Sequence, residues 1–304
     1  MGRMLSIPAD VVYIQEPFNL QTSMDSMDYR FRHWFPYTPG MEDRESVMQS
    51  LERTLEFRHR APVPETFGPY RALKRKTRQI LENSDHRWHR RRPLIKDPLA
   101  LFSAEDLAKR FHLDVVCMVR HPLAFCSSLK KWNWKFPFSH FLEQPALMER
   151  HFAAEADEIR RFAEEEQPIV HQAALLWNLF HKVIRSYQQD HPDWHFPRHA
   201  EVVADPVPQF EILYQKLGLE FNDEVALKLS QSLHGGRGET SQTIYQPRDA
   251  SSVGHTWKKR LATEEIAHVL ARTQVLRKHF YPEESDLSQV RRCETIWGWS
   301  AMSA

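Results

Sequence analysis

Four side chains of this 304-residue sequence are candidates for a catalytic or binding role: Glu16, Lys96, Arg120 and Ser128. Each of them comes directly after a short apolar run or lies in the helix that follows one. A guanidinium at a strand end, with a hydroxyl near the start of the next helix, can hold a phosphate, and backbone N–H groups of that helix assist. Lys96 is either a functional cation or the ion-pair partner of Asp97. Taken singly, Arg120 also fits a surface arginine, Ser128 half of an ordinary Ser-Ser pair, and Glu16 a loop acid.

The elements that would position these residues are short apolar strands alternating with amphipathic helices. We predict strands at 11–14 (VVYI), 93–96 (PLIK), 113–119 (LDVVCMV) and 200–204 (AEVVA), and helices at 42–57, 103–111, 123–131 and 168–188. This alternation favours a mostly parallel sheet covered on both faces. Ligands of such sheets bind outside the carboxyl ends of the strands, so Glu16, Lys96 and Arg120 are expected to converge at one crevice.

The composition excludes several classes of protein. With 41 Lys and Arg against 40 Asp and Glu, the net charge of +1 argues against a protein built to coat nucleic acid or an anionic membrane. Three scattered cysteines are too few for a disulfide framework or a zinc site. Without an apolar run of about 20 residues or a signal-peptide pattern, we expect a cytoplasmic protein that forms one α/β domain over 1–304, with no stable membrane insertion.

The positions of the glycines match neither of the two common nucleotide-binding loop motifs. The chain has nine glycines, and none of them forms G-x-x-x-x-G-K-[ST] or G-x-G-x-x-G.

Residues 71–92 are strongly basic, with nine Arg or Lys against two acids. They could form a nucleic-acid arm in which Trp88 stacks on a base, or a rim that attracts an anionic ligand. We favour the simpler interpretation, a basic surface helix and turn, and expect no nucleic-acid partner.

Five blocks of the sequence, in this order, resemble the PAPS-dependent sulfotransferases, most closely the branch with tyrosylprotein and bacterial sulfotransferases. They are the start (1–6 and 8–19), PLIKDP at 93–98, VVCMVRHP at 115–122 with Ser127-Ser128, AEVVADP at 200–206, and GHTWKKRL at 254–261. The resemblance covers nearly the whole chain. It implies a P-loop NTPase-like three-layer fold with a mostly parallel sheet.

The resemblance also implies a role for each candidate residue. Arg120 and Ser128 match the pair that holds the 3′-phosphate of PAPS, Lys96 the lysine near the transferring sulfonate, and Glu16 the acid that accepts the proton of the acceptor. PAPS is then the co-substrate and no metal is needed. The acceptor would be a hydroxyl or amine of a carbohydrate, peptide or small metabolite, bound by loops at 17–40 and 133–150.

One part of the family pattern is missing from the sequence. These enzymes bind the 5′-phosphosulfate with an R-S-G-T-T loop between the first strand and the first helix, whereas residues 1–5 match only the remainder of that helix. We expect an N-terminally truncated fold whose start lies upstream; the alternative is a non-catalytic nucleotide-binding relic. A P-loop kinase is disfavoured because Arg120 stands where a Walker B acid is expected. Strands 11–14 and 115–119 should then flank an empty position or pair abnormally.

Overall fold

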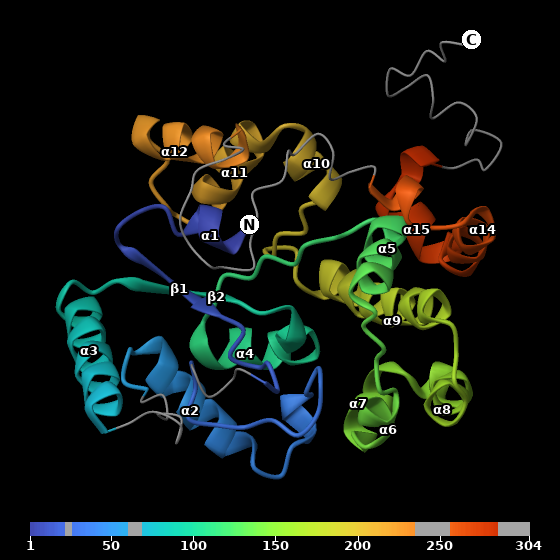
Figure 1. Ribbon diagram of the computed structural model, residues 1–304, viewed down its shortest axis with the longest axis horizontal. Coiled ribbons are helices and arrows are strands. Elements are labelled where there is room, and N and C mark those ends of the chain that lie inside the picture. The colour runs from blue at the N-terminus through green and yellow to red at the C-terminus, as the bar shows by residue number, and fades with distance from the viewer. Residues whose placement is uncertain (22–25, 60–68, 235–255, 285–304) are drawn as a thin grey trace.

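The computed structural model describes residues 1–21, 26–59, 69–234 and 256–284. The chain is a mostly helical α/β protein with a small two-stranded parallel sheet near its centre (Figure 1). None of the helices in these ranges is both long and apolar enough to cross a membrane.

The sheet consists of β1 (Val11–Gln15) and β2 (Arg92–Lys96), which confirms the strands predicted at 11–14 and 93–96. The strands run parallel, in a register that pairs Val11 with Arg92 and Gln15 with Lys96. Because parallel strands end on the same side, the residues that follow them are brought together.

A second parallel pairing involves the run predicted as the third strand. Val116 bridges to His195 and Val119 to Arg198, so this run is extended but bonds at isolated bridges only. The fourth predicted strand, 200–204, is wrong, because these residues belong to helix α10 (His199–Ala204). Val116 and Val119 pair instead with residues 195–198, just before α10. At the start of α10, the His199 N–H donates to the Val119 carbonyl at 2.8 Å.

The two parallel pairs lie near each other without a shared backbone ladder in the described part of the chain. A guanidinium nitrogen of Arg92, at the start of β2, lies 3.7 Å from a carboxylate oxygen of Asp114. Leu94, Val116 and Met118 pack against one apolar cluster that also contains Leu5. In the described ranges, residues 11–15 pair with β2, whereas Val116 and Val119 bridge to His195 and Arg198. The expectation that strands 11–14 and 115–119 flank an empty position or pair abnormally stays a prediction.

The helices account for most of the described residues. They are α1 (Gly2–Leu5), α2 (Arg44–Leu55), α3 (Pro69–Trp88), α4 (Ala104–Phe111), α5 (Pro122–Trp132), α6 (Ser139–Leu142), α7 (Pro145–His151), α8 (Ala156–Glu164), α9 (Ile169–Asp190), α10, α11 (Pro206–Lys216), α12 (Asp223–His234), α14 (Thr263–Arg272) and α15 (Gln274–Phe280). The predicted helices at 42–57, 103–111, 123–131 and 168–188 are confirmed as α2, α4, α5 and α9.

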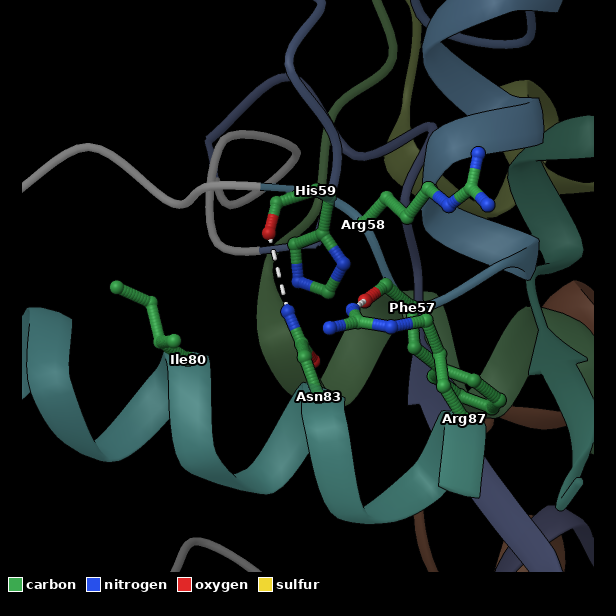
Figure 2. A pocket seen from close by; sticks show the side chains of 6 residues that line it. All are labelled: Phe57, Arg58, His59, Ile80, Asn83 and Arg87. Carbon is green, nitrogen blue, oxygen red and sulfur yellow. Dashed lines mark hydrogen bonds between the residues drawn. The ribbon is translucent and has the colours of Figure 1, made fainter. Parts of the chain in front are cut away.

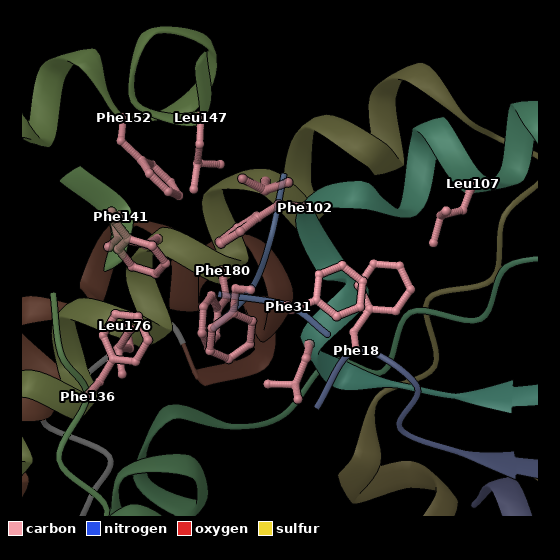
Figure 3. Close-up of a cluster of buried hydrophobic side chains, with 14 of the residues drawn as sticks. Phe18, Phe31, Phe102, Leu107, Phe136, Phe141, Leu147, Phe152, Leu176 and Phe180 are labelled. Carbon is pink, nitrogen blue, oxygen red and sulfur yellow. The ribbon is translucent and has the colours of Figure 1, made fainter. Parts of the chain in front are cut away.

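The largest core cluster is rich in phenylalanine and lies on one side of the small sheet (Figure 3). Phe180 projects from α9 toward Phe102 of the 3₁₀ helix after β2 (Pro98–Ser103), with ring centroids 5.8 Å apart. Phe136 and Phe141 pack on each other at 4.6 Å. Burial of these large rings is the main source of stability here, and it fixes β2 relative to the loops that cover the core.

Candidate active site at the strand ends

Glu16 and Lys96 form an ion pair at the carboxyl ends of β1 and β2. The register aligns Gln15 with Lys96, so Glu16 is the first residue beyond the strand, and its N–H donates to the Lys96 carbonyl at 3.0 Å. One Glu16 carboxylate oxygen accepts from the Lys96 ammonium, and the other accepts from the Asn19 amide at 3.0 Å. The Glu16 side chain is 19% exposed and that of Lys96 41%, so both remain accessible to a ligand.

The backbone of Glu16 lies in the left-handed region, with φ of 46°. Non-glycine residues seldom adopt this conformation, which costs free energy and persists where surrounding contacts hold it. Here the Asn19 N–H donates to the Glu16 carbonyl at 3.1 Å and closes the turn. The turn directs the carboxylate across the end of β2 instead of along β1.

Asp97 fastens this turn to β2. Its carboxylate accepts the backbone N–H of Phe18 at 2.6 Å and that of Leu99 at 2.9 Å. Burial raises the pKa of Asp97 to about 6, although both N–H donors favour the charged form. Phe18 is itself anchored by stacking on Phe31 at 4.5 Å. Asp97 therefore links the turn that carries Glu16 to the strand that carries Lys96.

Replacing Asp97 by alanine is expected to lower the free energy of unfolding by about 2 kcal/mol, because two buried N–H groups lose their acceptor. Urea unfolding at pH 7 measures the change. Asp157→Ala is the control, since the Asp157 side chain is 98% exposed and its removal should cost less than about 0.5 kcal/mol. Equal stability of Asp97→Ala and the unmodified chain would contradict the role assigned to this carboxylate.

Arg120 and Ser128 lie on the second parallel pair and the helix that follows it. The Trp177 indole of α9 donates to the Arg120 carbonyl at 2.8 Å and holds the end of the extended run. His121 then caps α5, where its ring nitrogen accepts the Leu123 N–H at 3.3 Å. Ser128 follows in the second turn of α5 and is half-buried. Trp177 and Asp97 were not predicted as positioning residues; Asp97 was considered only as an ion-pair partner of Lys96, which pairs with Glu16 instead.

Positive groups from both parallel pairs act on one small region. Burial, together with the charges of Arg120 and of the Met1 amino group, lowers the pKa of His199 to about 4. Burial and the charge of Lys96 in turn lower the pKa of the Met1 amino group. The structure brings Glu16 and Lys96 together directly. The convergence of Arg120 with them stays a prediction.

The two loops expected to bind an acceptor pack against each other. The Trp34 N–H donates to a ring nitrogen of His140 at 2.9 Å, and the Tyr37 N–H to the side-chain oxygen of Gln144 at 2.8 Å. The rings of Trp34 and Trp134 meet edge to face, with centroids 6.2 Å apart. Residues 34–37 and 134–144, one part of each expected loop, are thus in direct contact.

A cavity of about 350 Å³ lies elsewhere, between α3 and residues 57–59 (Figure 2). None of the four candidate residues lines it, so it is not the site predicted from the sequence. Within the described ranges, no cluster of three or more His, Cys, Asp or Glu side chains is arranged to hold a metal ion.

Comparisons of this chain with protein-family models, with curated proteins and with solved structures found no match. A functional assignment therefore depends on the residues themselves.

Proposed function

We propose that this protein is a cytoplasmic sulfotransferase that moves a sulfonate group from PAPS to a hydroxyl or amine. The observation that carries the proposal is the Glu16–Lys96 ion pair at the carboxyl ends of two parallel strands. It supplies an acid–base group and a cation side by side, where ligands of parallel sheets bind.

In the proposed reaction, the acceptor oxygen or nitrogen attacks the sulfur of PAPS as the bond from sulfur to the bridging phosphate oxygen breaks. The phosphate oxygen keeps the electron pair of that bond, and Lys96 stabilises its growing charge. Glu16 takes the acceptor proton, which makes the attacking atom a better nucleophile. The products are the sulfated acceptor and adenosine 3′,5′-bisphosphate (PAP), and the chemistry needs no metal.

The ion pair describes the ligand-free arrangement of these two groups. A donor with several negative charges competes with Glu16 for the Lys96 ammonium. Once Lys96 turns to the donor, Glu16 keeps its hydrogen bond from Asn19 and is available to the acceptor proton. Binding of the donor would thus prepare the base.

Arg120 and Ser128 are the proposed 3′-phosphate ligands. Arg120 ends the extended run that bridges to 195–198, and Ser128 lies in the second turn of the helix that follows, where a guanidinium and a hydroxyl can hold a phosphate. The finer fold, a P-loop NTPase-like sheet, is part of this proposal. Its support is that both pairings are parallel, β1 with β2 and, at isolated bridges, Val116 and Val119 with His195 and Arg198.

Isothermal titration calorimetry with PAP tests the donor site. Arg120→Ala is expected to weaken binding by at least about tenfold, since a charge-assisted hydrogen bond contributes about 1.5–3 kcal/mol. Ser128→Ala should weaken it by a smaller factor without endangering the fold. Arg110→Ala, at an exposed position of α4, is the control and should bind as the unmodified chain does. Absence of PAP binding to the unmodified chain, or binding that neither site variant changes, refutes the donor site.

A second candidate is nucleotide binding without catalysis. The observation that favours it is that Glu16 and Lys96, the two groups proposed to act in catalysis, are paired with each other. Incubation with ³⁵S-labelled PAPS and a panel of phenols, amines and saccharides separates the two. Sulfated product supports the transferase, whereas PAP binding with no product from any acceptor supports the binding protein.

A further inference from the structure

Helix α3 (Pro69–Trp88) directs its apolar side chains to solvent instead of to the core. Five of its large apolar side chains are strongly exposed: Tyr70 (77%), Leu73 (65%), Ile80 (57%), Leu81 (65%) and Trp88 (84%). Only four other large apolar side chains are exposed in the rest of the described chain, and these are scattered. Such a concentration is a mark of an interaction site.

The spacing of these residues places them on one face of the helix. Tyr70, Leu73, Leu81 and Trp88 follow one another at three, eight and seven residues, so they share a stripe along the axis. We call these four side chains the α3 stripe; Ile80, at its edge, also lines the cavity of Figure 2. At 1.5 Å per residue, a helix of 20 residues is about 30 Å long.

The opposite face of α3 docks on the protein through polar groups. The Asn83 amide donates to the His59 carbonyl at 3.1 Å, and the His86 ring packs on that of Phe57 with centroids 5.0 Å apart. Figure 2 shows Asn83 and Arg87 pointing from α3 toward residues 57–59. An ordinary surface helix shows the reverse arrangement, with its apolar stripe on the core. The α3 stripe is therefore outward-facing as a consequence of how the helix is anchored.

Cations border the α3 stripe on both sides. At 100° per residue, Lys74 and Arg78 lie along one border and Lys76 along the other, whereas Arg87 turns to the Phe57 carbonyl. Residues 69–92 hold nine Lys or Arg against Glu82 and Asp85, a net charge of +7, although the whole chain carries only +1. The near-neutral total thus conceals one strongly basic surface.

We propose that α3 binds the surface of an anionic lipid bilayer, with its axis parallel to the membrane plane and the α3 stripe in the boundary between headgroups and acyl chains. The Trp and Leu side chains of the stripe suit the boundary with the acyl chains, and the bordering Lys and Arg side chains suit the anionic headgroups. The helix lies on the bilayer and does not cross it. This inference goes beyond the proposed function and holds whatever reaction the protein performs.

The charges and shape of α3 disfavour other occupants. A second copy of the chain would bring together two α3 helices, each with six Lys or Arg against two acids, which costs electrostatic free energy. Single-stranded nucleic acid would satisfy the cations and could stack on Trp88, but it has no partner for Leu73 and Leu81. A bilayer with anionic headgroups satisfies both kinds of side chain at once.

Sedimentation with vesicles of phosphatidylcholine, alone or with 30% phosphatidylserine, tests the proposal. The full chain should bind the vesicles that contain phosphatidylserine, weakly or not at all the neutral ones, and less at high salt. Leu73→Ser/Leu81→Ser is expected to reduce partitioning by about tenfold or more, because two buried leucine side chains are lost. Val275→Ser is the matched control, since Val275 is 75% exposed on α15 and should not contribute.

Quenching of tryptophan fluorescence by acyl-brominated lipids places the helix. Bound protein should be quenched, and Trp88→Phe should remove most of the quenching. Trp132→Phe, which changes a side chain that is 62% exposed on α5, should leave it intact. All four variants alter exposed residues, so thermal unfolding should show that they fold.

Three results would overturn the proposal. One is the absence of binding to vesicles that contain phosphatidylserine, and another is binding that the double leucine variant does not weaken. The third is self-association without lipid, or tight binding of a single-stranded oligonucleotide, abolished by the same leucine substitutions while vesicles are not bound.

Discussion

Turnover of sulfonate transfer is expected to fall by about 10²–10³-fold when Lys96 is replaced by methionine. Methionine is similar to lysine in length but carries no charge, so the leaving phosphate oxygen would develop its charge without a cation beside it. Because the proposed 3′-phosphate contacts come from Arg120 and Ser128, the affinity for PAP should change much less than kcat. Transfer of ³⁵S-labelled sulfonate to the best acceptor, together with calorimetry on PAP, measures both.

The Lys182–Glu155 pair provides a matched control for this substitution. The side chains of Lys182 and Glu155 are 43% and 27% exposed, close to the 41% and 19% of Lys96 and Glu16. Lys182→Met should therefore perturb stability to a similar, small extent. It should leave turnover unchanged, since this pair lies away from the strand ends. Equal loss of turnover in both variants, or near-normal turnover in Lys96→Met, would argue against a role for Lys96 in the transition state.

Acid is expected to destabilise the protein by several kcal/mol between pH 6.5 and about 4.5. Burial lowers the pKa of His181 to about 3, and the pKa values of His151 and His199 to about 4. His181 is only 3% exposed and lies between Trp177, on which it stacks at 3.9 Å, and Phe280. There is no room there for the hydration that an imidazolium needs.

The sign of the effect follows from the direction of these shifts. A histidine whose pKa is lower in the folded state binds a proton more readily when the chain unfolds. Its contribution to stability is complete above pH 6.5 and is lost as the pH falls toward the folded-state value. One pH unit is equivalent to about 1.4 kcal/mol for each such group at most, so His181 alone accounts for about 3 kcal/mol by pH 4.5. Asp97, whose pKa is raised to about 6 in the folded state, makes folding more favourable as the pH falls below 6. This opposes the loss from the histidines, but it is one group against three.

Urea unfolding between pH 7.5 and 4.5 measures this dependence. His181→Gln should flatten the curve, since an amide can still donate to the Trp177 carbonyl but does not titrate. His89→Gln is the control, because the His89 side chain is 56% exposed, and its curve should follow that of the unmodified chain. A pH dependence that His181→Gln leaves unaltered would contradict the assignment.

The order of elements could largely be predicted from the sequence. The β-branched run at 11–14 and the apolar run at 93–96 are local patterns, and they form β1 and β2. The long amphipathic stripe at 168–188 predicts α9 for the same reason. The prediction of a strand at 200–204 is wrong, because a five-residue apolar run fits a strand and a helical turn equally well. The choice depends on which segment pairs with Val116 and Val119.

The candidate site could be predicted only as a set of positions. That Glu16 and Lys96 follow apolar runs could be predicted, because hydrophobic periodicity is a local property. That they meet depends on tertiary structure, because the register of two strands about 80 residues apart pairs Gln15 with Lys96 and leaves Glu16 just beyond that pair. The positioning contacts of Asp97 and Trp177 likewise depend on where distant backbone groups lie.

The same distinction applies to α3. Its basic, amphipathic composition is visible in the sequence, and a surface helix is the interpretation that it favours. The direction in which the apolar face points is not a local property, since it depends on which side of the helix finds partners. Asn83 and Arg87 find them in the carbonyls of His59 and Phe57, and this tertiary anchoring turns Leu73, Leu81 and Trp88 toward solvent.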